Sequence, residues 1–294
     1  LFGAERFRQH GASLARAQPT APARRWSWPI GRKAFFPRLL VNMQTLKRSR
    51  QYLELLDQYG ESRGLAGEWL LDNFHLIEAQ ATEIRTGLPL GYYRTLPKLA
   101  NSPLTGLPRV YGIAWAFVAH TDSSFDAPLL EQFLQAYQEV DALTLGELWA
   151  IPVNLRVVLL ENLARLADGV ARHRAAQQAA DWCCEQHETT IPQQLNASYA
   201  GLMDPALRSS FLAQVALRLH GGDSGAWSAW LDAQGVDTDA LVASVQDGYA
   251  ADNVSVSNAV SALHAINRVN WQDLIAQASP VIQTLSLSTA FMAE

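Results

Sequence analysis

The most restrictive feature of this sequence is a stripe of apolar residues spaced alternately four and three positions apart. The stripe consists of Leu70, Phe74, Ile77, Ala81 and Ile84. In a helix of 3.6 residues per turn these positions lie on one face, which indicates a face buried in a core. We therefore predict one helix from Gly67 to about Gly87.

Helical patterns of the same kind recur on both sides of this stripe. They predict helices over about 36–59, 108–120, 126–140 and 145–170, and further helices up to a last one that begins near Asn270. No alternating strand pattern extends beyond a few residues, and no repeat of about 30–45 residues indicates a solenoid. The sequence predicts an all-α fold, an irregular multi-helix bundle of helical hairpins with about ten helices and an extended N-terminal strap.

The first 38 residues are predicted to form a part of their own. Residues 1–18 have the pattern of a short amphipathic helix, and the four prolines and Gly31 between Pro19 and Pro37 favour an extended, irregular strap. We predict that residues 39–294 form a single helical domain, with a possible subdivision near 170–190.

Two helix starts carry specific capping signals. Asp126 is a typical N-cap residue, followed by Pro128 in the first turn. Thr144 and Glu147 match the capping box, in which a hydroxyl and a carboxylate accept hydrogen bonds from each other's backbone amides. Pro152, inside the helix that follows, is expected to kink or split it, because proline removes one backbone hydrogen bond.

Charge is distributed unevenly along the chain. Residues 1–50 contain 11 of the 23 lysines and arginines and one acid, so this part is strongly basic and the rest is acidic. The simplest prediction is that this basic arm wraps the acidic body, and residues 24–50 are the part that could instead contact a membrane. The alternative is binding to an anionic membrane surface, and we do not expect a nucleic acid partner.

Cysteine use and hydropathy limit the type of protein. Cys183 and Cys184 are adjacent, which is typical neither of a structural disulfide nor of a zinc site, and a reducing compartment fits best. The longest apolar run, residues 110–119, is too short to cross a bilayer, and no signal peptide pattern is present. Because the sequence begins at Leu1 without a methionine, we expect a fragment or a processed chain.

Several polar residues are candidates for catalysis. Glu68, Asp72 and His75 are spaced to share one helix face, and Asp122 and Glu147 are the other candidate acid/base groups. A hydrolase would need two carboxylates facing each other across a cleft, about 5 to 9.5 Å apart. The structural alternative, which we favour, is that Asp72 and His75 hydrogen-bond to neighbouring loops, with Arg94, Arg109 or Arg156 as partners. For Glu147 and Glu161 the favoured interpretation is a salt-bridge network centred on Arg156. No metal site is predicted, because a metal needs three or four converging ligands.

A second set of candidates would bind a sugar. An aromatic face stacks on the apolar face of a pyranose, and neighbouring charged groups bind its hydroxyls. The aromatic candidates are Tyr92, Tyr93, Trp115 and Trp149, and the guanidinium candidates are Arg94 and Arg109. The chain contains nine tryptophans and eight tyrosines, so plain core packing is the favoured alternative.

Several long segments, taken in order, resemble the N-terminal region of bacterial cyclic β-1,2-glucan synthases. The most extensive are GEWLLDNFH at 67–75, YYRTLPKL at 92–99 and LTLGELWA at 143–150. Shorter matching segments lie at 1–6, 108–111, 119–122, 161–166 and 255–258. The resemblance thus covers most of the chain.

This resemblance implies a function for the parent protein rather than for the segment itself. Synthases of this family are large inner-membrane enzymes that build the glucan from UDP-glucose with a divalent metal. Here Asp237-Thr-Asp239 is the one Asp-X-Asp run, its position is typical of a helix cap, and no Gln-X-X-Arg-Trp motif occurs. The resemblance therefore implies an accessory, non-catalytic scaffold without a cofactor of its own, on the cytoplasmic side of the bacterial inner membrane. Its partners would be the transferase and membrane regions of the parent chain. The alternatives are a carbohydrate-binding module for β-1,2-glucan and an independent glycoside-processing enzyme.

Overall fold

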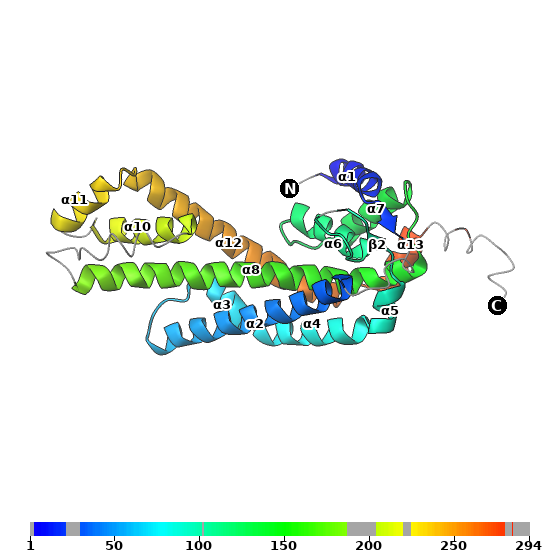
Figure 1. The fold of residues 1–294 in the computed structure, drawn as a ribbon, viewed down its shortest axis with the longest axis horizontal. Coiled ribbons are helices and arrows are strands. Elements are labelled where there is room, and N and C mark those ends of the chain that lie inside the picture. The colour runs from blue at the N-terminus through cyan, green and yellow to red at the C-terminus, as the bar shows by residue number, and fades with distance from the viewer. Residues whose placement is uncertain are drawn as a thin grey trace. The chain divides into compact units, whose positions relative to one another are not determined.

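The computed structural model describes residues 3–21, 30–101, 103–186, 204–219, 225–279 and 284 (Figure 1). Within these residues the chain forms twelve helices and one ladder of two short strands. The strands β1 (Thr20–Ala21) and β2 (Lys98–Leu99) are antiparallel, with Thr20 opposite Leu99. The all-α prediction is confirmed. None of the helices in these ranges is long and apolar enough to cross a membrane.

The chain divides into two compact units, each made of several segments. The first unit comprises Leu1–Lys47, Asp72–Arg165 and Ser257–Glu294, and the second comprises Arg48–Leu71 and Leu166–Val256. In chain order the helices are α1 (Ala4–Ala17), α2 (Ile30–Gln58), α3 (Gly64–Asp72), α4 (Phe74–Gly87), α5 (Leu90–Thr95), α6 (Arg109–His120), α7 (Ala127–Gln138), α8 (Leu145–Gln186), α10 (Pro205–Leu219), α11 (Gly225–Ala233), α12 (Thr238–Ile266) and α13 (Trp271–Ala278).

The boundaries between the units fall inside α2, α3, α8 and α12 rather than in loops. On α8 the boundary lies between Arg165 and Leu166, just before the 170–190 region in which the sequence allows a subdivision. The single helical domain predicted for residues 39–294 remains a prediction.

In the first unit, α6 is buried on nearly all sides. Nine of its twelve residues are buried, as expected for a helix that is apolar around most of its circumference. The ring of Phe117 on α6 lies 5.8 Å from the ring of Phe7 on α1 and 5.9 Å from that of Phe133 on α7. At Gly11 the backbones of α1 and α7 approach so closely that an added Cβ would lie 2.6 Å from the Phe133 carbonyl oxygen. These contacts dock α1 onto the unit (Figure 1).

The predicted N-terminal part is confirmed in its first half and corrected in its second. The amphipathic helix forms as α1, and Thr20–Ala21 is extended as β1. The strap, however, does not reach Pro37, because α2 already begins at Ile30. Residues 22–29 lie outside the described residues. Pro37 is the eighth residue of α2, past the first turn, so the helix continues through it despite the loss of one backbone hydrogen bond.

The apolar stripe is distributed over two helices instead of one. All five stripe residues are buried. The helix predicted from Gly67 is interrupted at Asn73, which separates α3 from α4. Asparagine is a poor helix former because its side chain competes for backbone hydrogen bonds, so a break at this position has a local cause.

The capping signals are confirmed at both helix starts. The Asp126 carboxylate accepts a hydrogen bond from the Leu129 amide at 2.8 Å. At the start of α8, the Thr144 amide donates to Glu147 Oε2 at 2.9 Å, and the Glu147 amide donates to Thr144 Oγ1 at 3.2 Å. Pro152 does not split α8, which continues to Gln186.

The core of the second unit lies between α8, α10 and α11. Trp227 and Trp230 of α11 pack edge to face, with ring centroids 5.6 Å apart, against Phe211 of α10. Cys183 and Cys184 are half-buried beside this cluster. Burial raises the pKa of both thiols, that of Cys184 to about 11, so they are protonated at neutral pH.

Candidate functional site

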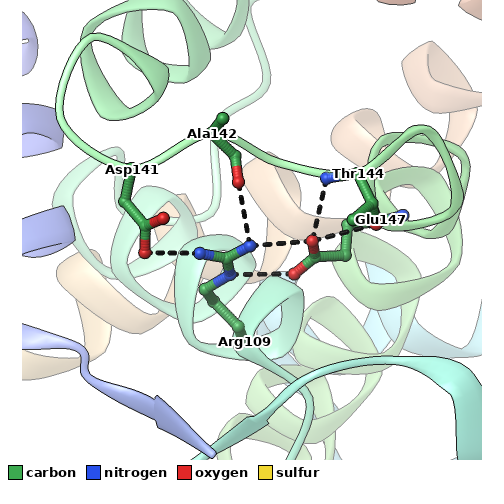
Figure 2. Close-up of polar contacts among 5 residues, drawn as sticks. All are labelled: Arg109, Asp141, Ala142, Thr144 and Glu147. Atoms are coloured by element: carbon green, nitrogen blue, oxygen red, sulfur yellow. Dashed lines mark hydrogen bonds and ion pairs between the residues drawn. The ribbon is translucent and has the colours of Figure 1, made fainter. Parts of the chain in front are cut away.

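The most buried ionic cluster joins the starts of α6 and α8. Arg109, the first residue of α6, donates from Nε to Glu147 Oε1 at 2.8 Å and from Nη2 to Glu147 Oε2 at 2.7 Å (Figure 2). The two side chains are 5% and 0% exposed. A bidentate pair of this kind is the strongest geometry for a guanidinium and a carboxylate.

Further hydrogen bonds join this cluster to neighbouring protein groups. Arg109 Nη1 donates to Asp141 Oδ2 at 2.5 Å, and Nη2 donates to the Ala142 carbonyl oxygen at 3.2 Å (Figure 2). Glu147 also accepts from the amide and the hydroxyl of Thr144. Burial opposes the charge on Arg109, but the hydrogen bond and charge of Glu147 outweigh it and raise its pKa. The capping box is therefore also the anchor of a buried ion pair.

The arginine at the centre of the polar network is Arg109 and not Arg156. Arg156 donates to two amide oxygens, that of Gln80 at 2.7 Å and that of Asn267 at 3.0 Å. Burial lowers the pKa of Arg156, and the negative charge of Glu83 offsets only part of this effect.

The two candidate tyrosines on α5 have structural partners. The Tyr92 hydroxyl donates to the Gly146 carbonyl oxygen, which ties α5 to the first turn of α8. Tyr93 is buried, and the Lys98 ammonium lies 3.5 Å from the centre of its ring. Burial raises the pKa of both tyrosines, and the charge of Glu147 adds to the rise at Tyr92.

A second Arg–Glu pair lies further along α8, at the protein surface. Arg38 Nε of α2 is 3.2 Å from Glu161 Oε1, and Arg38 Nη2 donates to the Tyr111 hydroxyl at 3.2 Å. The Tyr111 hydroxyl donates to Glu161 Oε2 at 2.5 Å. Burial and the charge of Glu161 raise the pKa of Tyr111, so its proton remains available for this bond.

Beside this pair the first unit has a groove of about 500 Å³, which we call the Trp115 groove. The helices α2, α6 and α8 and the turn after α6 contribute its walls. Its lining combines apolar Val118 and Val158 with the indole of Trp115. The polar lining consists of Arg38, Asp122, Ser123, Glu161, Asn162 and Arg165.

Most of these polar groups are held in place by hydrogen bonds. Asn162 Nδ2 donates to Ser123 Oγ at 2.6 Å, and its carbonyl oxygen accepts from Arg165 Nη2 at 2.8 Å. The turn itself is unusual, because Asp122 and Ser123 both have positive φ, at 48° and 62°. Side chains other than glycine rarely adopt this conformation, and its cost is of the order of 1–3 kcal/mol per residue.

The other candidate residues are placed as follows. Glu68, Asp72 and His75 are exposed on α3 and α4, and Arg94 is exposed on α5. Trp149 is 45% exposed on α8, outside the Trp115 groove. Asp122 lines the groove, whereas Glu147 is buried with Arg109. Within the described ranges, no three His, Cys, Asp or Glu side chains converge to hold a metal ion.

Of Arg32 and Lys33 the structure describes only the backbone, and the four basic residues from Arg38 to Arg50 pair with acidic residues. Besides Arg38, Lys47 Nζ is 3.8 Å from Glu78, and Arg48 Nη2 is 3.0 Å from Asp168. These pairs fit an arm that packs on the acidic body. Arg24 and Arg25 lie outside the described residues. The anionic membrane surface therefore remains a prediction.

Sequence reasoning missed the residues that complete the groove. Arg38 was assigned only to the arm, and Asn162 and Arg165 were not candidates. The sequence does indicate that four of the groove residues share one face of α8, because they are spaced three or four positions apart. These residues are Val158, Glu161, Asn162 and Arg165. The spacing does not show that this face lines a groove with Trp115, because the groove depends on tertiary packing.

Comparison with known proteins extends these observations. No protein-family model matches the chain. The chain is 34% identical over 233 residues to the cyclic beta-(1,2)-glucan synthase NdvB of Rhizobium meliloti (strain 1021). The match covers 77% of this chain and 8% of the relative, so the chain spans a small part of that protein's length. With the resemblance of the segments at 67–75, 92–99 and 143–150, this similarity shows that the chain belongs to the cyclic β-1,2-glucan synthase family.

Proposed function

We propose that this chain is an accessory, non-catalytic region of a cyclic β-1,2-glucan synthase, which scaffolds the transferase part of the same protein. Membership of the family supports the parent activity. The small share of the relative that the chain matches supports an accessory role, because most of such a protein lies elsewhere.

The proposal rests mainly on the bonding of the buried carboxylate, which is fully engaged with other protein groups. Glu147 is the candidate carboxylate with the lowest exposure, and its two oxygens bind Arg109 and Thr144. A general acid or base must reach a substrate proton within about 3 Å, either directly or through one water. A fully buried carboxylate engaged in this way stabilises the junction of α6 and α8 instead.

The remaining parts of the proposal concern the parent protein. UDP-glucose and a divalent metal would be bound by its transferase region, which would also be the main partner of this chain. We place the chain on the cytoplasmic side of the bacterial inner membrane, attached to the membrane through the rest of the parent. Residues 24–50 would add contact with anionic lipid, and the pairing of Lys47 and Arg48 with carboxylates limits how much charge is left for it.

The proposal is tested in the full-length synthase that contains this chain. We expect that deleting the chain, or introducing Glu147→Gln, lowers cyclic glucan output because less synthase assembles in the membrane. Membrane fractions are assayed for synthase by immunoblot and for glucan made from labelled UDP-glucose. Glu139→Gln, at an exposed pair with Arg8, is the matched control and should leave both readouts unchanged.

The isolated 294-residue chain provides the complementary measurement. It should neither release UDP from UDP-glucose nor shorten β-1,2-glucan. Turnover of either compound would overturn the non-catalytic assignment. Hydrolysis of the glucan would favour a glycoside-processing enzyme, for which Asp122 and Glu161 in the Trp115 groove would be the first carboxylates to replace. Unchanged synthase amount and glucan output after deletion would contradict the scaffold.

A further inference from the structure

We infer that the Trp115 groove is a binding site for a neutral gluco-oligosaccharide, with Trp115 as the platform on which a glucose ring stacks. The identity of the sugar rests on the proposed function, because family membership is what points to glucan. The site itself rests on the shape, the aromatic exposure and the charge of the groove.

The size of the groove suits a small ligand. Binding sites for small molecules have volumes of about 300 to 1,000 Å³ and combine an apolar lining with a few fixed polar groups. The groove of about 500 Å³ lies within this range. Val118 and Val158 supply the apolar surface.

Trp115 is exposed where packing would predict burial. Its neighbours on α6, Ala114 and Ala116, are 1% and 2% exposed, whereas Trp115 is 49% exposed. A half-exposed indole on a helix that is otherwise mostly buried adds little to the core. An indole face in a groove is, however, the surface on which the apolar face of a pyranose stacks.

The charge of the groove argues for an uncharged ligand. Arg38 is balanced by Glu161, with which it pairs at 3.2 Å. Arg165 and Asp122 carry the other two charges of the lining, and these also cancel. A nucleotide or sugar phosphate would need excess positive charge, whereas planar guanidinium, carboxylate and amide groups with no net charge suit sugar hydroxyls.

The polar wall is pre-organised, which reduces the entropy lost on binding. Asn162 is fixed between Ser123 and Arg165 at 2.6 and 2.8 Å. The positive φ angles of Asp122 and Ser123 place the turn at the edge of the groove in a conformation that costs free energy. Such strain persists where the surrounding structure holds it and is concentrated at functional sites.

The test is calorimetric titration of the full 294-residue chain with linear β-1,2-linked gluco-oligosaccharides, and separately with UDP-glucose and β-1,4-linked gluco-oligosaccharides. We expect heat with the β-1,2 ligands and a loss of affinity of about tenfold or more in Trp115→Ala, because the stacking platform is removed. Trp149→Ala is the matched control, since Trp149 is 45% exposed but lies outside the groove. Asn162→Ala should also weaken binding, through the loss of a fixed polar group.

Three outcomes would overturn the inference. The first is the absence of heat with the β-1,2 ligands. The second is equal affinity of Trp115→Ala and the unaltered chain for these ligands. The third is that UDP-glucose binds more tightly than the glucan and that this binding is lost in Trp115→Ala. Circular dichroism of each variant establishes that it is folded. These results are separate from the test of the scaffold, because a chain that binds no glucan would still assemble the synthase.

Discussion

Two Arg–Glu pairs on α8 have the same chemistry and different surroundings. Glu147 and Glu161 each contact an arginine, Arg109 or Arg38, and each accepts a hydrogen bond from a hydroxyl. The first pair is 5% and 0% exposed, and the second is 46% and 14% exposed. The buried pair has all its partners within the protein, whereas the other pair lines a groove that is open to a ligand.

The difference teaches that burial, and not the residue types, separates a pair enclosed in the core from a pair that lines a groove. In the interior, two charges lose their hydration, and the free-energy cost is offset only if both stay paired. At the surface, water screens each charge, so either partner can exchange its contacts for those of a ligand.

The largest expected effect is the loss of the buried pair. Glu147→Gln leaves the guanidinium of Arg109 buried with only Asp141 as a nearby negative charge, so we expect a loss of about 3–5 kcal/mol in the free energy of unfolding. Urea denaturation followed by circular dichroism measures this change. Replacing both partners, as Arg109→Met with Glu147→Leu, should cost less than Glu147→Gln alone. A double variant that is less stable than Glu147→Gln would argue against burial as the cause.

Lys98 extends the comparison to a buried cation whose ammonium donates to the Tyr93 carbonyl oxygen at 2.6 Å and, among the described residues, pairs with no carboxylate. Burial lowers its pKa from 10.5 to about 7. Between these values the unfolded chain binds more protons than the folded chain, so stability should rise with pH from 7 to 9, by on the order of 2 kcal/mol.

This rise is measured as the difference between the unaltered chain and Lys98→Met at each pH, which removes the contribution of other groups. Lys98→Met should lack the rise. If the two chains have parallel pH profiles, Lys98 is not the titrating group and burial of its ammonium has been overestimated.

Replacing Glu161 of the surface pair should change the free energy of unfolding less than replacing either buried group. Glu161→Gln is expected to lower the free energy of unfolding by about 1 kcal/mol, since Arg38 is half-exposed and the hydrogen bond from Tyr111 is retained in neutral form. This loss of stability should become smaller when the salt concentration is raised from about 0.05 M to about 0.5 M, because salt screens the pair. A loss as large as that of Glu147→Gln would remove the distinction between the two pairs.

The smallest effect is expected at the exposed pair of Arg8 and Glu139, whose side chains are 54% and 62% exposed. Glu139→Gln should change stability by less than about 0.5 kcal/mol, because screening and side-chain entropy cancel most of the attraction. The same denaturation experiment measures it. Together the variants at Glu147, Glu161 and Glu139 form a series of decreasing burial and of decreasing numbers of hydrogen bonds.

Much of the fold was predictable because its signals are local. The stripe from Leu70 to Ile84, the Asp126 cap and the capping box at Thr144 depend on residues within a few positions of each other, and each is confirmed. The interruption at Asn73 and the early start of α2 were not predicted. Apolar periodicity does not show a break at a single residue such as Asn73, and the content of proline in a segment does not locate the first residue of a helix.

The candidate site was predictable only in part. Sequence reasoning selected Trp115 and Asp122, which line the groove, and Arg109 and Glu147, which lie elsewhere. The available pattern did not show that Arg109 and Glu147 pair with each other, because they are 38 residues apart and on different helices. Glu68, Asp72 and His75 share no contact with the groove, and their catalytic role remains an untested prediction.

The sequence by itself determined the helical class, the position of most helices and the family, since periodicity, capping and similarity are properties of contiguous residues. Only the tertiary structure decided which charges are buried and which line a groove. That decision depends on how α2, α6 and α8 pack in the first unit, which brings Arg38, Trp115 and Glu161 to one surface and encloses Glu147. Burial is a property of the whole packing, and the free energy of a charge depends on burial more than on its neighbours in sequence.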